Sequence, residues 1–209
     1  MGGSIASYVM HGDVVELAVL GGNVVPHNGE LPAERRYQIH GCAQQAKDVL
    51  GISRLSIDCY PGNQFDTVPM LKLVKTVETW IEAAAPDLVF THHAGDLNID
   101  HQRTHQAVMT ALRPMKGHSV RQVATFEVPS ATEWGFSQFK AFTPNLFISI
   151  TGDCLQRKLD ALACYDTEMR EFPHPRSKEA ITALAQYRGS HVGVEAAEAF
   201  QIVWRTGIF

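Results

Sequence analysis

The sequence predicts an α/β protein with a Rossmann-like, doubly wound and mostly parallel sheet that carries helices on both faces. Short apolar runs of strand length alternate along the chain with longer segments of helical periodicity, as in repeated β-α-β units. The 209 residues contain no internal repeat, low-complexity tract or linker. A chain of this length suits one domain with a buried core, so we predict a single domain over residues 1–209.

The elements follow from the position of the apolar runs and their stop signals. Strands are predicted at Val14–Leu20, Arg54–Cys59, Leu88–Phe90, Gln122–Val128 and Leu146–Ile150. Helices are predicted at residues 2–10, at Ala33–Leu50, which Gly51 ends, at Pro69–Ala85 and at Asp100–Leu112. The last third is predicted to be helical, at Leu155–Cys164, Lys178–Tyr187 and Val194–Phe200.

The bulk composition excludes several classes of function. With 45% hydrophobic and 19% charged residues and a formal net charge of −4, the chain lacks the basic character of a nucleic-acid-binding protein. No apolar run reaches the length of a membrane span, and the N-terminus lacks the pattern of a signal peptide. The four cysteines form no C-x-x-C pair and fit neither a disulfide framework nor a zinc-thiolate site. We therefore expect a cytoplasmic protein with reduced thiols.

The segment from Thr91 to His105 carries the strongest functional signal. Four histidines and two aspartates follow a buried strand and lead into a helix, at the edge where open α/β sheets place their ligands. Imidazole and carboxylate groups suit zinc or a similar ion, and His101 is the best candidate ligand. His92 and His93 are adjacent on an extended segment, so at most one is expected to face the site. Asp100 fits either a role in the site or the N-cap of the helix.

Several motifs resemble the PIG-L/LmbE-like family of zinc-dependent N-deacetylases. Nearly the whole chain is covered, by residues 1–6, 62–69, 91–101, 126–134, 172–177 and 187–200. The resemblance implies removal of an acetyl group from a small N-acetylated amino sugar, such as an N-acetylglucosamine conjugate. It also implies a bound zinc ion and a homo-oligomeric assembly. Iron(II) is an alternative to zinc, because both ions bind such His/Asp sites.

The resemblance also assigns roles to individual residues. His101 matches a zinc ligand, and Asp100 matches an acidic position that supports the base or the ligand sphere. Asn98 stands where several members carry an oxyanion-stabilising histidine, a role that His93 or His92 would take over here, unless they are supporting or surface residues. In the family a zinc-bound water attacks the acetamide carbon, and a carboxylate takes its proton and delivers it to the departing amine.

The chain departs from the family at its start. The first residues match the end of an opening motif whose His-Pro-Asp-Asp part supplies two zinc ligands and the general base. We expect upstream codons to encode a strand and that motif, and we expect this chain by itself to be poorly stable, to oligomerise or to recruit a strand. An inactive sugar-binding or scaffolding relative is the alternative function. If the chain binds metal as it stands, then His92, His93 or Asp96 would complete the site.

Four further residues are candidates for sugar binding: Glu127, Asp66, Arg36 and Arg188. Three of them also have a structural alternative. Glu127 follows a strand and could stabilise its loop, while Asp66 could cap the next helix. Arg36 opens the first long helix, and Arg188, in the C-terminal motif, could meet a phosphate or hold a loop in place.

Overall fold

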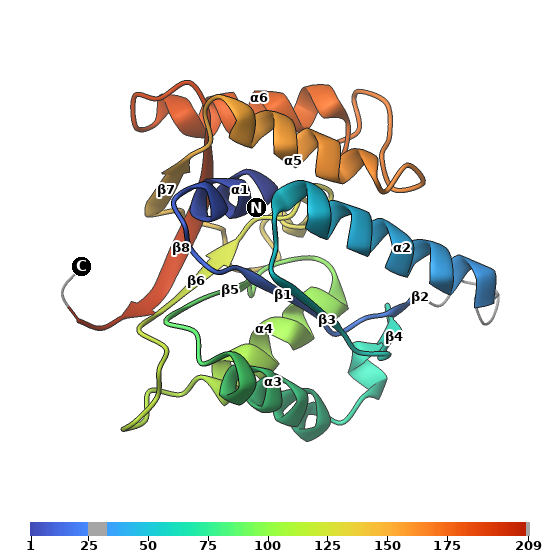
Figure 1. Ribbon diagram of the computed structural model, residues 1–209, viewed down its shortest axis with the longest axis vertical. Helices are drawn as coiled ribbons and strands as arrows, with labels where there is room; N and C mark the ends of the chain where they lie inside the picture. The colour runs from blue at the N-terminus through green and yellow to red at the C-terminus, as the bar shows by residue number, and fades with distance from the viewer. Residues whose placement is uncertain (25–32, 208–209) are drawn as a thin grey trace. The chain divides into compact units, whose positions relative to one another are not determined.

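The computed structural model describes residues 1–24 and 33–207, with side chains left undescribed at 23–24 and 33–38. These residues form two compact units, each built from two segments of the chain (Figure 1). The first unit contains Met1–Cys59 and Phe147–Ala199, and the second contains Tyr60–Leu146 and the residues from Phe200 on.

The first unit combines helices with a short parallel sheet. Its elements are α1 (Gly2–Met10), β1 (Glu16–Val19), β2 (Asn23–Val24), α2 (Ala33–Leu50), β3 (Arg54–Ile57), most of β7 (Leu146–Ser149), α5 (Asp153–Ala163), α6 (Lys178–Ser190) and the start of β8 (Ala197–Arg205). Strands β1 and β3 are parallel, with Glu16 opposite Arg54 and Val19 opposite Ile57. Helices α1 and α2 both pack against α5, as Figure 1 shows.

The core of the first unit is made of small and aliphatic side chains from its helices and from the segments between its elements. Ile5, Leu50 and Ile150 belong to this buried cluster. A Cβ atom at Gly3 would lie 2.9 Å from Ile150 side-chain atoms, so the absence of a side chain there lets α1 approach Ile150 closely. Burial of these apolar groups, rather than helix propensity alone, holds α1 in place.

A buried carboxylate, Glu198, caps the N-terminus of α1 within this unit. It accepts a hydrogen bond from the backbone amide of Ser4 at 2.7 Å and pairs with Lys158 Nζ at 2.6 Å and with the N-terminal ammonium at 3.4 Å. Burial by itself would raise the pKa of Glu198, but the two ammonium groups outweigh it and hold that pKa well below its usual range. Glu198 is therefore charged and paired.

The second unit carries the segment that the sequence singled out. Its elements are β4 (Pro61–Gly62), the short 3₁₀ helix η1 (Phe65–Thr67), α3 (Met70–Ala84), β5 (Leu88–His92), α4 (Ile99–Ala111), β6 (Gln122–Phe126), a second 3₁₀ helix η2 (Glu133–Gly135) and the remainder of β8. Strands β5 and β6 are parallel, whereas β6 and β8 are antiparallel. Helix α3 packs against α4, and α4 packs against β5.

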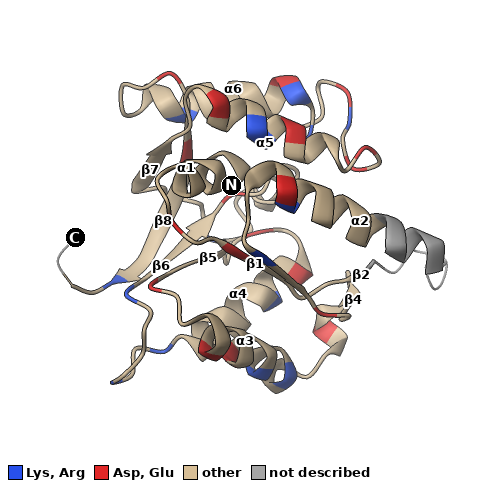
Figure 2. Ribbon diagram, in the orientation of Figure 1, with Lys and Arg blue, Asp and Glu red and all other residues tan. Residues whose placement is uncertain are grey.

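The predicted α/β class is confirmed by the alternation of elements and the parallel pairs β1–β3 and β5–β6. Most predicted bounds agree with the observed ones within about two residues. The single-domain organisation stays a prediction. Figure 2 shows acidic and basic residues interspersed on α3, α5 and α6.

One predicted helix is wrong: Val194–Phe200 runs into β8 instead of forming a helix. The residues Glu195-Ala-Ala-Glu-Ala have high helix propensity. However, Ala197 and Phe200 are fully buried, and Phe200 pairs with Phe126 across β6 and β8. The ring of Phe200 also packs on Phe90 of β5, with centroids 4.8 Å apart. Tertiary burial and strand pairing thus override local propensity.

Candidate active site

The candidate site lies where β5 leads through residues 93–98 into α4, all within the second unit. Asn98 is the N-cap of α4, with extended backbone angles, and its side-chain oxygen accepts from the amides of Asp100 and His101 at 2.8 and 3.4 Å. The predicted capping role of Asp100 is therefore wrong, because Asp100 already lies in the first helical turn. Asn98 satisfies two amides that the helix leaves without an internal partner.

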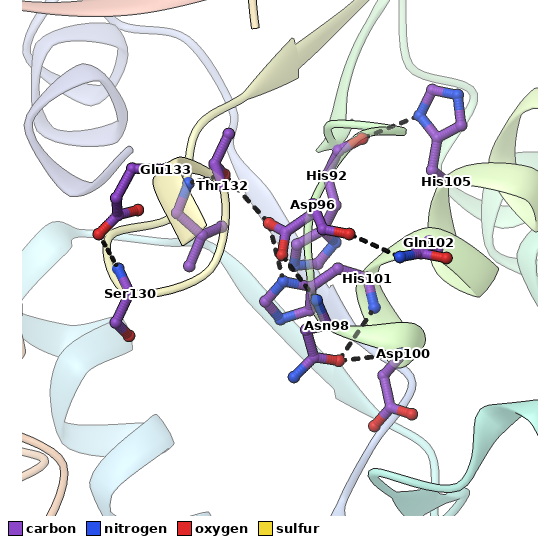
Figure 3. A network of polar contacts seen from close by, with 11 residues as sticks. His92, Asp96, Asn98, Asp100, His101, Gln102, His105, Ser130, Thr132 and Glu133 are labelled. Carbon is purple, nitrogen blue, oxygen red and sulfur yellow. Dashed lines mark hydrogen bonds and ion pairs between the residues drawn. The ribbon is translucent and has the colours of Figure 1, made fainter. Parts of the chain in front are cut away.

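Asp96 is the buried centre of the site. Its side chain is 0% exposed, and its Oδ1 accepts from the amide of Asn98 at 3.0 Å. Its Oδ2 accepts from the hydroxyl of Thr132 at 3.1 Å and lies 3.1 Å from Nδ1 of His101 (Figure 3). The last contact has the distance of an ion pair without the alignment of a hydrogen bond. Gln102 donates to the Asp96 carbonyl at 2.7 Å.

His92 is the second imidazole at this position. Its ring stacks on that of His101, with centroids 4.1 Å apart and planes 21° apart, and it also contacts Phe126 at 4.9 Å. Burial lowers the pKa of His92 well below its usual range, and the nearby His101 and His105 lower it further. His92 is consequently a neutral imidazole at physiological pH.

His93 points elsewhere, as the alternation of side chains along a strand requires. Its Nε2 donates to the carbonyl oxygen of Lys140 at 2.9 Å, and its ring meets Phe142 edge-on at 5.3 Å. The side chain is buried, at 3% exposure. His105, which could have faced solvent, donates from Nδ1 to the carbonyl of His92 at 2.9 Å. The structure therefore brings His92, and not His93, to His101.

Asp100 stands beside His101 in the sequence, but its carboxylate points away from that ring (Figure 3). It accepts hydrogen bonds from the backbone amides of Asn63 and Phe65, the latter at 3.0 Å. Asn63 has a φ of 60°, in the left-handed region, and Phe65 is 2% exposed. Asp100 thus ties the turn between β4 and η1 to the start of α4.

The remaining four candidates come from separate segments of the chain. Asp66 is exposed in η1 and caps no helix, because the N-cap of α3 is Pro69. Glu127 follows β6 directly and is half-buried. Arg188 lies on α6 in the first unit, with its guanidinium 5.7 Å from the ring centre of Tyr187. Arg36 lies in α2, among the residues whose side chains are outside the description.

The fit of these residues to a metal ion is partial. His101 has a buried carboxylate on its Nδ1 side, which is how metal-binding histidines are commonly held. Within residues 1–24 and 33–207, however, no three His, Cys, Asp or Glu side chains come together as a metal site. The described residues alone therefore do not make up a complete zinc or iron site.

Sequence reasoning missed the organising roles of Asp96, Thr132 and Gln102. The sequence offers Asp96 as a possible metal ligand and gives no sign that it is the partner of His101. One local signal was available, since Asp and Asn two residues apart often bond to nearby backbone amides in turns. Thr132 had no such signal, because 36 residues separate it from Asp96.

The fold and this site define an α/β protein with a histidine- and aspartate-rich loop at the carboxyl edge of a parallel strand. The chain belongs to the PIG-L family, described as GlcNAc-PI de-N-acetylase, whose sequence model matches residues 1–112. The resemblance seen in the sequence is thereby confirmed. A search of the curated proteins finds no match.

Several solved structures share the fold. N,N′-diacetylchitobiose deacetylase from Pyrococcus horikoshii is 17% identical, with a TM-score of 0.73 over 97% of this chain and 78% of that one. A zinc-inhibited teicoplanin deacetylase is 14% identical, with a TM-score of 0.74 over 100% and 94%. The 4-carboxy-2-hydroxymuconate hydratase GalB from Pseudomonas putida is 19% identical, with a TM-score of 0.72 over 100% and 91%. At these identities the likeness shows the fold alone, and the fold serves more than one chemistry.

Among residues 1–24 and 33–207, no helix is both long and apolar enough to cross a bilayer.

Proposed function

We propose that this protein is a hydrolase that removes the acetyl group from a small N-acetylated amino sugar, with His101 as a ligand of zinc or iron(II). Membership of the PIG-L family supports the reaction class. Two of the structural neighbours described above are named as deacetylases, one of a diacetylated sugar, which agrees with it.

The observation that carries the proposal is the contact between Asp96 and His101. Nδ1 of His101 faces the fully buried carboxylate, which leaves Nε2 as the nitrogen for a metal or a substrate. The side chain of His101 is 22% exposed, so the ring is held from one side and accessible from another. A carboxylate at one ring nitrogen, with the other nitrogen free to bind, is the usual setting of a metal-binding histidine.

Amide hydrolysis also needs groups that handle the oxyanion and the protons. We assign the oxyanion-facing role to His92, since its ring is neutral and stacked on His101, whereas His93 already donates to Lys140. The Nδ1 atom of His92 has no hydrogen-bond partner among the described residues. We assign Asp100 a supporting role, because both of its carboxylate oxygens accept from the turn at residues 63–65.

Glu127, Asp66, Arg36 and Arg188 remain proposed contacts to the sugar or its conjugate. A homo-oligomeric state and a cytoplasmic location are proposals of the same kind, which sedimentation analysis and cell fractionation would test.

A second candidate function is an inactive sugar-binding relative. It is favoured by one observation, that the described residues bring no three metal-ligating side chains together. The two candidates differ in metal content and turnover, so one set of measurements separates them.

The test uses the purified chain dialysed against metal-free buffer, then supplied with zinc or, without oxygen, iron(II). Release of free amine from N-acetylglucosamine and its methyl glycoside is followed by an amine-reactive fluorophore, and bound metal by elemental analysis. His101→Ala is compared with His118→Ala, which changes an exposed histidine of a loop. We expect His101→Ala to abolish turnover and reduce bound metal while His118→Ala keeps both. Sugar binding without turnover or metal in the wild type would establish the second candidate instead.

A further inference from the structure

The hydroxyl group of Thr132, on the loop after β6, is held from two sides. Its oxygen accepts a hydrogen bond from the backbone amide of Val128 at 2.7 Å and lies 3.1 Å from Oδ2 of Asp96. A hydroxyl group has a single proton, and an ionised carboxylate can only accept. Because the Val128 amide brings its own proton, the hydroxyl proton of Thr132 is directed at Asp96.

The turn that carries Thr132 is closed by its own backbone. The amides of Ala131 and Thr132 donate to the carbonyl of Val128 at 3.1 and 2.9 Å. The amide of Leu97 donates to the carbonyl of Ala131 at 3.1 Å, which ties this turn to the segment that carries Asp96. The Thr132 hydroxyl is therefore a donor in a fixed position, to which the carboxylate of Asp96 is matched.

The carboxylate of Asp96 is oriented by a donor at each oxygen. Oδ1 accepts from the amide of Asn98 at 3.0 Å, and Oδ2 accepts from Thr132. In this orientation Oδ2 lies 3.1 Å from Nδ1 of His101 (Figure 3). The side chain of Asp96 is fully buried, so solvent does not replace a lost donor at its surface. Without the Thr132 hydroxyl, Oδ2 would be free to move away from the imidazole.

The position of Oδ2 bears on where the proton of the neutral His101 ring lies. A neutral imidazole carries its proton on either Nδ1 or Nε2, and the partner of one nitrogen decides which. A negatively charged oxygen beside Nδ1 favours the proton on Nδ1 and leaves the lone pair of Nε2 free. The ring of His92, stacked on His101 with centroids 4.1 Å apart, limits rotation of the His101 ring.

We propose that Thr132 is a positioning residue for His101. It holds the carboxylate of Asp96 beside Nδ1, and it thereby keeps Nε2 without a proton and available for binding. The inference rests on the proposed function for its effect on turnover, but the location of the proton can be measured without turnover. Phe126, at the end of β6, contacts the ring of His92, so one short segment of the chain organises both imidazoles.

The experiment locates the ring proton by nuclear magnetic resonance on the full chain with isotope-labelled histidine rings. It is made at about pH 8, where a histidine with the ordinary pKa of about 6.5 is neutral. Metal ions are removed first, because an ion bound to Nε2 would itself fix the proton on Nδ1. The signals of His101 are identified by their loss in His101→Gln.

Three variants are compared with the wild type. Thr132→Val removes the hydroxyl group with little change in shape, whereas Thr132→Ser keeps it. The matched control is Thr79→Val, which makes the same change at an exposed threonine of α3 whose hydroxyl donates to the carbonyl of Lys75 at 3.0 Å. A merely structural role of Thr132 in its loop would not change which ring nitrogen of His101 carries the proton.

We expect the proton on Nδ1 of His101 in the wild type, in Thr132→Ser and in Thr79→Val. In Thr132→Val the share of rings protonated at Nε2 should rise severalfold. In the amine-release assay with metal supplied, kcat of Thr132→Val should fall about 10–100-fold, with a smaller change in KM, and Thr132→Ser should restore it.

A proton on Nε2 of His101 in the wild type would overturn the proposal, and this result does not depend on whether Thr132→Val folds. An unchanged proton location in folded Thr132→Val would overturn it as well. A proton on Nδ1 that depends on the Thr132 hydroxyl, in a chain that releases no amine, would support the positioning role while the proposed function failed.

Discussion

Asp96 allows the sharpest prediction, because its carboxylate joins the start of α4 to Thr132. Asp96→Ala removes two hydrogen bonds made to a charged acceptor, from the Asn98 amide and the Thr132 hydroxyl. Such bonds contribute about 1.5–3 kcal/mol each. Part of their sum is offset because the variant no longer buries a charge. We therefore expect the free energy of unfolding to fall by about 3 kcal/mol, or about 6–12 °C in Tm for a chain of this size.

Thermal unfolding followed by circular dichroism at pH 7 measures the effect. Thr132→Val removes the bond to Asp96 and also the bond that the Thr132 hydroxyl accepts from the amide of Val128, so it should cost about 2–4 kcal/mol. Combined with Asp96→Ala it should add less than its separate effect, since both changes break the same bond. The control is Asp166→Ala, at an exposed carboxylate that accepts from the amide of the next residue, and its Tm should not change. If Asp96→Ala and Asp166→Ala had the same Tm, the buried carboxylate would not organise the site and the reasoning would be refuted.

Two further predictions concern stability. Glu198→Gln leaves the partly buried Lys158 without its carboxylate, so we expect the free energy of unfolding, measured in urea at pH 7, to fall by about 3 kcal/mol. The control is Glu16→Gln, in an exposed ion pair with Arg54, which should lower the free energy of unfolding by at most about 1 kcal/mol. Folding lowers the pKa of Glu198, so its contribution to stability is fully present only above the unfolded pKa of about 4.3. The difference in free energy of unfolding between wild type and Glu198→Gln should therefore narrow by about 1–2 kcal/mol from pH 7 to pH 3. A difference that widened would contradict the lowered pKa of Glu198. Gly95→Ala would place a Cβ atom 1.9 Å from the carbonyl oxygen of Lys140 and should therefore lower Tm. Gly41→Ala, in helix α2 with open space around it, is the control and should leave Tm unchanged or raise it. Equal melting temperatures for the two variants would show that the contact between Gly95 and Lys140 is not tight.

The elements of this fold were largely predictable because their signals are local. The apolar positions of α3 repeat at helical spacing, and Leu73, Val74 and Val77 are buried as a helical face requires. The strand at β5 is a short apolar run followed by polar residues. The error at β8 arose because burial of Ala197 and pairing with β6 depend on residues far away in the sequence.

The candidate site was predictable in part for the same reason. Residue types alone pointed to the segment around His101, and side-chain alternation limited the pair His92-His93 to one inward-facing ring. Which ring faces His101, and what holds it, depends on contacts with Phe126 and Lys140 on other segments. Propensity and spacing carry no information on such pairs.

The division of the chain also has a consequence for its synthesis. Residues 1–59 need residues 147–199 to complete the first unit, and residues 60–146 need those from Phe200 on. At about 5–20 residues per second, the N-terminal segment leaves the ribosome roughly seven to thirty seconds before its partner segment is complete. Strand β8, which follows every other described strand, belongs to both units and completes them almost together. The apolar helix faces of residues 1–59 therefore stay without their partner segment for most of translation.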